Sequence, residues 1–138
     1  MGSMIELTEK PISPGLVISK VKTDSSGCVA TYVGLIRDFS HDKPVLSVEY
    51  KDTEGTAEKR LRQIASEIKK RWQVNNIAIC HRTGKLKVGE INFLVAIAAA
   101  HREEGLAACR YAVDRFKELM PTRKTETYLD GSTSVAVE

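Results

Sequence analysis

The chain has 138 residues, the size of one ordinary domain, and its 42% hydrophobic and 28% charged residues are typical of a globular fold. Its longest apolar-rich run, residues 91–100, is too short for a membrane helix, and a net charge of +3 is too mild to indicate nucleic-acid binding. Cys28, Cys80 and Cys109 are too widely and irregularly spaced for a disulfide framework or a paired-cysteine zinc site, which favours the reducing cytoplasm.

The N-terminal part of the chain predicts a short helix. Residues 1–3 (Met-Gly-Ser) ahead of Met4 are typical of a leader added by an expression vector, so we predict a single domain over residues 4–138 and no secretory signal. Ser13-Pro14 is a helix-start signal within residues 11–21. The expected apolar face of this helix comprises Leu16, Val17 and Val21.

Two strands and a helix are expected next. Residues 27–36 are apolar or small on both faces and rich in β-branched side chains, which predicts a central strand. A polar loop over residues 39–44 and a strand over residues 45–50 follow. Thr53 or Thr56 can then cap a helix whose apolar residues recur at three- and four-residue steps. These residues are Ala57, Leu61, Ile64, Ala65, Ile68 and Trp72.

The middle of the chain predicts two more strands. Residues 77–81 form the first, residues 83–89 a turn-rich connection, and residues 91–98 a second, buried strand. Because strands and helices mix without strict βαβ alternation, the fold class is predicted as α+β.

The C-terminal part predicts a long helix and a short strand. The helix is expected from about residue 101 to residue 120, since Pro121 disfavours helical angles in the residue before it. A strand over residues 125–129 and an Asp130-Gly131 turn follow. The expected apolar face of the helix comprises Leu106, Cys109, Val113, Phe116 and Met120.

Basic residues lie at the predicted ends of strands. Arg37 follows the first strand, and His101-Arg102 stands where the buried strand gives way to the long helix. The planar fork of arginine suits phosphate or carbonyl groups, and a helix N-terminus favours anions, so an anionic ligand is one interpretation. A solvated residue at the end of a strand is the other interpretation for each.

Two lysines bracket the expected end of the long helix. Lys117 shares a helix stripe with Arg110 and Asp114, and Lys124 follows Pro121 by three residues. A lysine held near other cations and partly removed from water can act as acid, base or nucleophile. The alternative is a solvated helix surface.

The remaining reactive side chains form no recognisable site. Cys109 lies at helical spacing on an apolar face and is expected in the core. His81-Arg82 and His41 have no partner at a suitable spacing. There is neither a Gly-rich phosphate loop with a lysine nor a cluster of His, Asp or Glu at metal spacing, so we expect no cofactor and no metal.

Taken together in chain order, the motifs of this sequence resemble those of the large, catalytic subunit of molybdopterin synthase. The similarity covers nearly the whole chain from Ile5 to Gly131. Its most specific part combines His-Arg-x-Gly-x-Leu, a following Ala-His-Arg and two lysines that flank a proline. The matching stretches are Val33-Gly34-Leu35-Ile36-Arg37, Val48-Glu49-Tyr50, residues 79–86, Val88-Gly89-Glu90, Ala100-His101-Arg102, residues 108–114 and residues 117–126.

The resemblance implies an α+β fold of the α/β-hammerhead kind with an additional antiparallel β-subdomain. It also implies an enzyme of molybdenum-cofactor biosynthesis, a cytoplasmic sulfurtransferase. Sulfur passes from the thiocarboxylated Gly-Gly C-terminus of a small ubiquitin-like subunit to cyclic pyranopterin monophosphate, which becomes the dithiolene of molybdopterin. Two large subunits form a homodimer, and each carries one small subunit, so that the assembly is a heterotetramer.

The resemblance also assigns residues to the site. Lys117 and Lys124 are expected to be catalytic: Lys117 is the candidate for proton transfer or transient covalent chemistry and Lys124 for stabilising the thiocarboxylate or a developing oxyanion, although the sequence does not divide these roles. Arg37, His101 and Arg102 are expected to converge on the cyclic phosphate. The substrate-binding set comprises Arg37, His101, Arg102, Lys117, Lys124 and Glu126.

Two other functions remain open. A non-catalytic paralogue would bind a ubiquitin-like partner without turnover, although the presence of both lysines speaks against it. A small basic nucleic-acid-binding domain would need aromatic side chains for stacking, and the one Trp, four Tyr and three Phe show no such pattern. A sulfur-transfer assay and a salt series of nucleic-acid binding discriminate among these functions.

Overall fold

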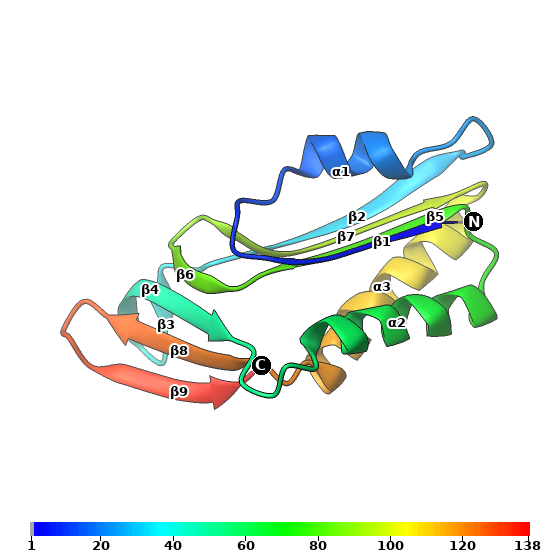
Figure 1. The fold of residues 1–138 in the computed structure, drawn as a ribbon. Helices are drawn as coiled ribbons and strands as arrows, with labels where there is room; N and C mark the ends of the chain where they lie inside the picture. Colours follow the sequence, from blue (N-terminus) through cyan, green and yellow to red (C-terminus); the bar gives the residue numbers. More distant parts are fainter. Residues whose placement is uncertain (1) are drawn as a thin grey trace.

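The first sheet has four strands, and its two inner strands are mostly buried. The computed structural model describes residues 2–138 and has two sheets and three helices (Figure 1). β1 pairs in parallel with β5, while β5 and β2 run antiparallel to β7, so β7 lies inside the sheet. The strands, in spatial order, are β1 (Gly2–Thr8), β5 (Asn76–Arg82), β7 (Ile91–Ala99) and β2 (Cys28–Leu35).

The second sheet lies beyond one end of the first (Figure 1). Its main path has the order β3-β4-β8-β9, and β6 also pairs with β4. Its own apolar cluster includes Val48, Tyr50 and Leu86. The strands are β3 (Phe39–Ser40), β4 (Lys43–Lys51), β6 (Gly84–Lys87), β8 (Arg123–Tyr128) and β9 (Thr133–Val137).

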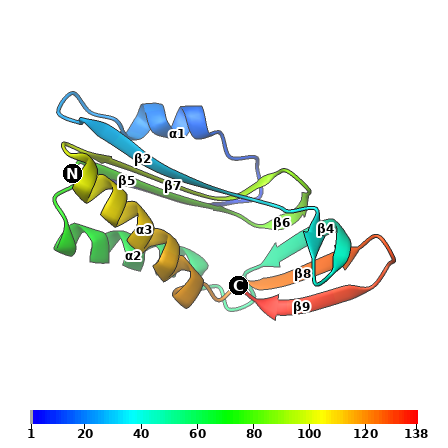
Figure 2. The ribbon, with the colours of Figure 1, turned by 180° about the vertical axis from the view of Figure 1, so that it is seen from behind.

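Three helices cover the two faces of the first sheet (Figures 1 and 2). α1 (Pro14–Val21) lies on one face, and α2 (Ala57–Arg71) and α3 (Arg102–Leu119) lie on the other. Ser13 caps α1 by accepting a hydrogen bond from the Leu16 amide at 3.4 Å, which confirms the predicted start. The α+β class and all three helices are as the sequence predicts.

The apolar faces of α1 and α3 differ from the prediction at two leucines. Leu16 is 56% exposed and Leu106 is 60% exposed. A Cβ added to Gly105 would lie 3.0 Å from Cys28 Sγ, so the start of α3 contacts β2 too closely for a large side chain between them. α3 therefore buries Gly105 and small residues such as Ala108 on this face instead of Leu106.

Several strand predictions also need correction. β2 is an edge strand of the described chain, not a central one, and its residues 31–33 are exposed. The predicted polar loop over residues 39–44 is a hairpin between β3 and β4, with His41 and Asp42 at φ 51 and 59 in its turn. The predicted connection over residues 83–89 contains β6, and β9 lies where no strand was predicted.

β1 begins at Gly2, within the three residues that the sequence predicts to come from an expression vector. Gly2 and Ser3 belong to β1 and pair with Asn76 and Ile77 of β5. Gly2 and Ser3 therefore extend the parallel pairing of β1 with β5. Their origin from an expression vector stays a prediction.

Candidate functional site

Two lysines and an arginine line one cavity where the two sheets meet. Lys117, Lys124 and Arg37 share a hollow of about 260 Å³. Small-molecule sites typically measure about 300–1,000 Å³, so this hollow is slightly smaller than a complete site. Arg37 and Lys117 have no ion-pair partner among residues 2–138, which leaves the cavity positively charged. The other lining residues are Tyr32, Gly34, Leu35, Tyr50, Asn92, Phe93 and Phe116.

The corner between α3 and β8 brings the two lysines together. Lys117 lies on the last turn of α3, and Lys124 is the second residue of β8. The ring of the buried Phe116 stacks on Phe93 with 3.7 Å between centroids, which holds the end of α3 against β7. The two lysines therefore line the cavity from the end of α3 and from the start of β8.

Glu126 is buried beside Lys124. Its Oε2 lies 3.8 Å from Lys124 Nζ, and its Oε1 accepts hydrogen bonds from Ser40 Oγ at 3.1 Å and from Tyr128 Oη at 2.9 Å. His41 Nε2 approaches the same Oε1 at 3.5 Å, a partner that sequence spacing did not indicate. Protein groups thus occupy both oxygens, an arrangement suited to orienting Lys124.

His81 is fully buried and packs against two residues that line the cavity. His81 Nδ1 lies 2.8 Å from the Asn92 carbonyl oxygen, and Nε2 lies 2.9 Å from Glu138 Oε2. The ring packs edge-on against Tyr50 and Phe116, with centroids 5.3 and 5.1 Å away. Sequence spacing indicated no partner for His81, because its partners come from β7 and from the residue after β9.

His101 and Arg102 lie at the opposite end of the first sheet from Arg37, so a single chain does not bring these three cations together, and their convergence on one phosphate stays a prediction. β2 and β7 are antiparallel, with Cys28 paired to Ala99. Arg37 follows the C-terminal end of β2, whereas His101 follows the C-terminal end of β7. The eight residues of β2 lie between these ends. At roughly 3.3 Å per residue, they span about 25 Å.

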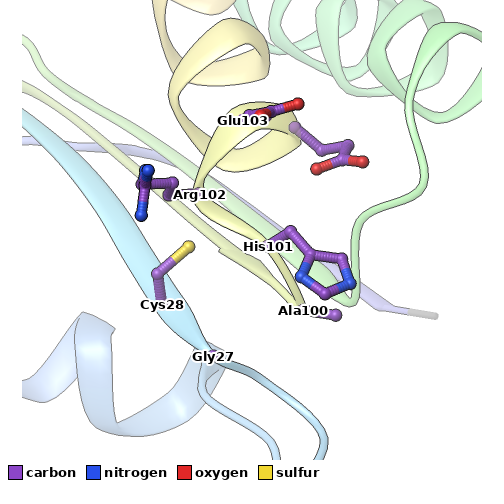
Figure 3. A pocket seen from close by; sticks show the side chains of 7 residues that line it. Gly27, Cys28, Ala100, His101, Arg102 and Glu103 are labelled. Carbon is purple, nitrogen blue, oxygen red and sulfur yellow. The ribbon is translucent and has the colours of Figure 1, made fainter.

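A second pocket, open and about 670 Å³ in volume, surrounds the start of α3. It is lined by His101 and Arg102, but also by Glu103 and Glu104, whose carboxylates offset the basic side chains. Figure 3 shows His101 and Arg102 leaving the helix start in different directions, with the Cys28 thiol on the Arg102 side. Within one chain, this pocket is not the phosphate site that the sequence predicted.

The described part of the chain contains no helix long and apolar enough to span a membrane. Within the same residues, no group of three or more His, Cys, Asp or Glu side chains is arranged to hold a metal ion.

Comparisons with known proteins connect this fold and cavity to one family. The family model described as "MoaE protein" matches residues 7–119. A protein from Nostoc sp. named "Molybdopterin synthase catalytic subunit" is 40% identical over 93% of this chain and 78% of its own length. A Bacillus subtilis protein of the same name is 34% identical over 91% of this chain and 80% of its own.

Solved structures agree with the family match. The crystal structure of molybdopterin synthase from Staphylococcus aureus superposes with a TM-score of 0.90 at 28% identity and covers 97% of both chains. A Helicobacter pylori complex of subunits 1 and 2 of molybdopterin-converting factor shares the fold, with a TM-score of 0.75 at 14% identity over 96% of this chain and 90% of that one.

The fold and the cavity define the class: an α+β protein with a basic hollow at the junction of two sheets. The chain belongs to the MoaE protein family, which confirms the resemblance found in the sequence.

Proposed function

We propose that the chain is the catalytic subunit of a molybdopterin synthase. It transfers sulfur from the thiocarboxylated C-terminus of a small ubiquitin-like subunit to cyclic pyranopterin monophosphate and so forms the dithiolene. The observation that carries this proposal is the convergence of Lys117, Lys124 and Arg37 on one cavity. The names of the relatives support it, as does the two-subunit complex of the Helicobacter pylori protein.

Each cationic group has a task that suits its surroundings. Lys117 is unpaired among residues 2–138, so its amine is available for proton transfer or for a transient covalent bond to substrate. Lys124, held beside Glu126, stabilises the thiocarboxylate or a developing oxyanion. Arg37 binds the anionic end of the substrate with its planar fork.

His101 and Arg102 join this site from a second copy of the chain. They lie too far from Arg37 to act with it in one chain, whereas a homodimer can bring one copy's helix start to the other copy's cavity. The edge strand β2 supports this arrangement, because Tyr32, Val33 and Leu35 expose 39%, 37% and 56% of their surface. Residues 4–138 then act as one unit, in the cytoplasm, where the three free cysteines stay reduced.

The test is a single-turnover assay with purified chain, cyclic pyranopterin monophosphate and a small ubiquitin-like protein carrying a C-terminal thiocarboxylate. Formation of molybdopterin with loss of one thiocarboxylate per sulfur transferred is expected. Binding of the small protein without any product would instead identify a non-catalytic paralogue. Failure to bind it at all would refute the proposed function.

A further inference from the structure

The hydroxyl of Tyr50 lies in the cavity wall and accepts a hydrogen bond, but its own proton has no acceptor among residues 2–138. Tyr50 is 4% exposed and lines both the main hollow and a smaller adjoining one next to Glu126. Its oxygen accepts a hydrogen bond from Asn92 Nδ2 at 3.1 Å. Among residues 2–138, no group accepts the Tyr50 proton. A buried donor without an acceptor costs free energy, so an acceptor supplied from outside the chain is expected here.

Two of the other three tyrosines are held differently, and the third, Tyr32, is exposed. Tyr128 donates its proton to Glu126 Oε1 at 2.9 Å, and Tyr111 donates to Glu67 Oε1 at 2.6 Å. Both phenols thus have a carboxylate acceptor of their own. Tyr50 is more deeply buried than Tyr111 and yet faces a cavity instead of a carboxylate.

The surrounding residues fix the position of the Tyr50 hydroxyl. The ring packs edge-on against His81, whose own nitrogens are both bonded. The Asn92 amide that donates to the hydroxyl lies over Gly34, where an added Cβ would stand 2.9 Å from Asn92 Oδ1. Because Asn92 donates to the Tyr50 oxygen, the Tyr50 proton remains free to be donated to a ligand.

Sheet register places this donor beside the lysine of the site. Tyr50 on β4 is paired with Lys124 on β8. Residues directly opposite one another on antiparallel strands project from the same face, with Cβ atoms about 4.5–5.5 Å apart. A neutral donor and a cation therefore line the same wall of the cavity, a combination that suits an anionic oxygen.

We infer that Tyr50 donates a hydrogen bond from its hydroxyl to the anionic oxygen that Lys124 binds. This inference deepens the proposed function and rests on it for the identity of the ligand, a phosphate or the carboxylate-like end of a peptide. No proton leaves Tyr50. Burial, together with the charge of Glu138, raises the pKa of Tyr50 well above its usual value, so the phenol keeps its proton at neutral and mildly alkaline pH.

The first test compares Tyr50→Phe with the wild-type chain in the single-turnover assay. The substitution keeps the ring and removes only the donor, so we expect the rate of sulfur transfer to fall about tenfold to a hundredfold. Thermal unfolding should change little. Tyr111→Phe is the matched control: it removes a hydroxyl on α3 outside the cavity and should keep the wild-type rate. A Tyr50→Phe variant as fast as this control would overturn the inference.

The second test needs no turnover. Inorganic phosphate and acetyl-Gly-Gly are titrated separately into the wild-type chain, Tyr50→Phe and Tyr111→Phe. Loss of about tenfold in affinity for one probe, in the Tyr50 variant alone, identifies the anionic group that Tyr50 contacts. Unchanged affinity for both probes refutes the inference even if the wild-type chain proves inactive, whereas weakened binding without sulfur transfer refutes only the proposed function.

Discussion

At the scale of single residues, the two lysines of the cavity differ in how they are held. Lys124 lies on a strand and has the buried carboxylate of Glu126 3.8 Å from its amine. Lys117 lies on the last helical turn and has no such carboxylate among residues 2–138. An unpaired amine can gain and lose a proton without leaving a carboxylate unpaired, so Lys117 is the better candidate for proton transfer.

Replacing Lys117 by alanine should therefore abolish most sulfur transfer while leaving the fold intact. General acid–base catalysis contributes about 10²–10⁴-fold in rate, and a loss of this order is expected. Lys117 is exposed, so the free energy of unfolding should change by less than about 0.5 kcal/mol. The measurements are single-turnover conversion of the precursor and urea unfolding.

Two further variants separate chemistry from charge. Lys117→Arg keeps the charge but cannot readily release a proton, so it should not restore the rate. Lys59→Ala removes an exposed lysine of α2 outside the cavity and should behave like the wild-type chain. Near-normal rates in the arginine variant would show that Lys117 contributes only charge.

The pair of His81 and Glu138 should contribute measurably to stability. Glu138→Ala leaves Nε2 of a fully buried ring without its acceptor, and an unsatisfied buried polar group costs about 1–3 kcal/mol. Urea unfolding measures the loss. As a control, Glu58→Ala removes an exposed ion pair with Arg62 and should cost less than about 0.5 kcal/mol. Equal effects of the two substitutions would contradict a structural role for Glu138.

At the scale of elements, α2 and α3 are joined by a carboxylate as well as by their apolar faces. Glu67 on α2 accepts hydrogen bonds from Arg115 Nε at 2.8 Å and from Tyr111 Oη at 2.6 Å, both on α3. These donors, Arg115 first and Tyr111 second, lower the pKa of Glu67 to about 2. The ionised carboxylate therefore holds the two helices together.

The Glu67 carboxylate, together with Arg115 and Tyr111, forms a clamp between α2 and α3, and the free energy of unfolding that it contributes should be lost in acid. In the folded chain Glu67 stays ionised down to about pH 2, whereas in the unfolded chain it is protonated below about pH 4.5. The contribution of Glu67 to the free energy of unfolding is therefore complete above about pH 4.5 and is lost as the pH falls from there to about 2. With the side chain 25% exposed, we expect about 1–2 kcal/mol at pH 6. Glu67→Gln should remove this contribution. If urea unfolding gave the same difference between variant and wild type at about pH 6 and about pH 2.5, the clamp would not be electrostatic.

Elements with a long periodic pattern could be predicted from the sequence, and short or edge elements could not. Apolar residues at three- and four-residue steps fix α2, the Ser13 cap fixes the start of α1, and the proline at position 121 fixes the end of α3. β6 has only four residues and one buried side chain, Leu86, too few to show an alternation. The sequence predicts β2 as a central strand because most of its exposed residues are apolar, and an exposed Val33 has the same sequence pattern as a buried one.

At the scale of the whole molecule, the residues of the site could be chosen from the sequence but not placed. Lys117 and Lys124 flank one helix end, so their proximity follows from local structure. The relation of Arg37 to His101 depends on whether β2 and β7 are parallel or antiparallel, which no local pattern reveals. The antiparallel register separates them by the length of β2, and this separation is the reason for proposing that two copies build each site.

A complementation experiment tests that proposal. If one copy supplies Lys117 and the other supplies His101, then Lys117→Ala and His101→Ala homodimers are both inactive at every site. When the two variants are mixed and allowed to exchange subunits, half of the dimers are mixed, and each of these holds one site with both native residues and one with neither. Random exchange should therefore restore about a quarter of the wild-type activity. If both residues acted from the same copy, no native site would form in any dimer, and the mixture would stay as inactive as its components.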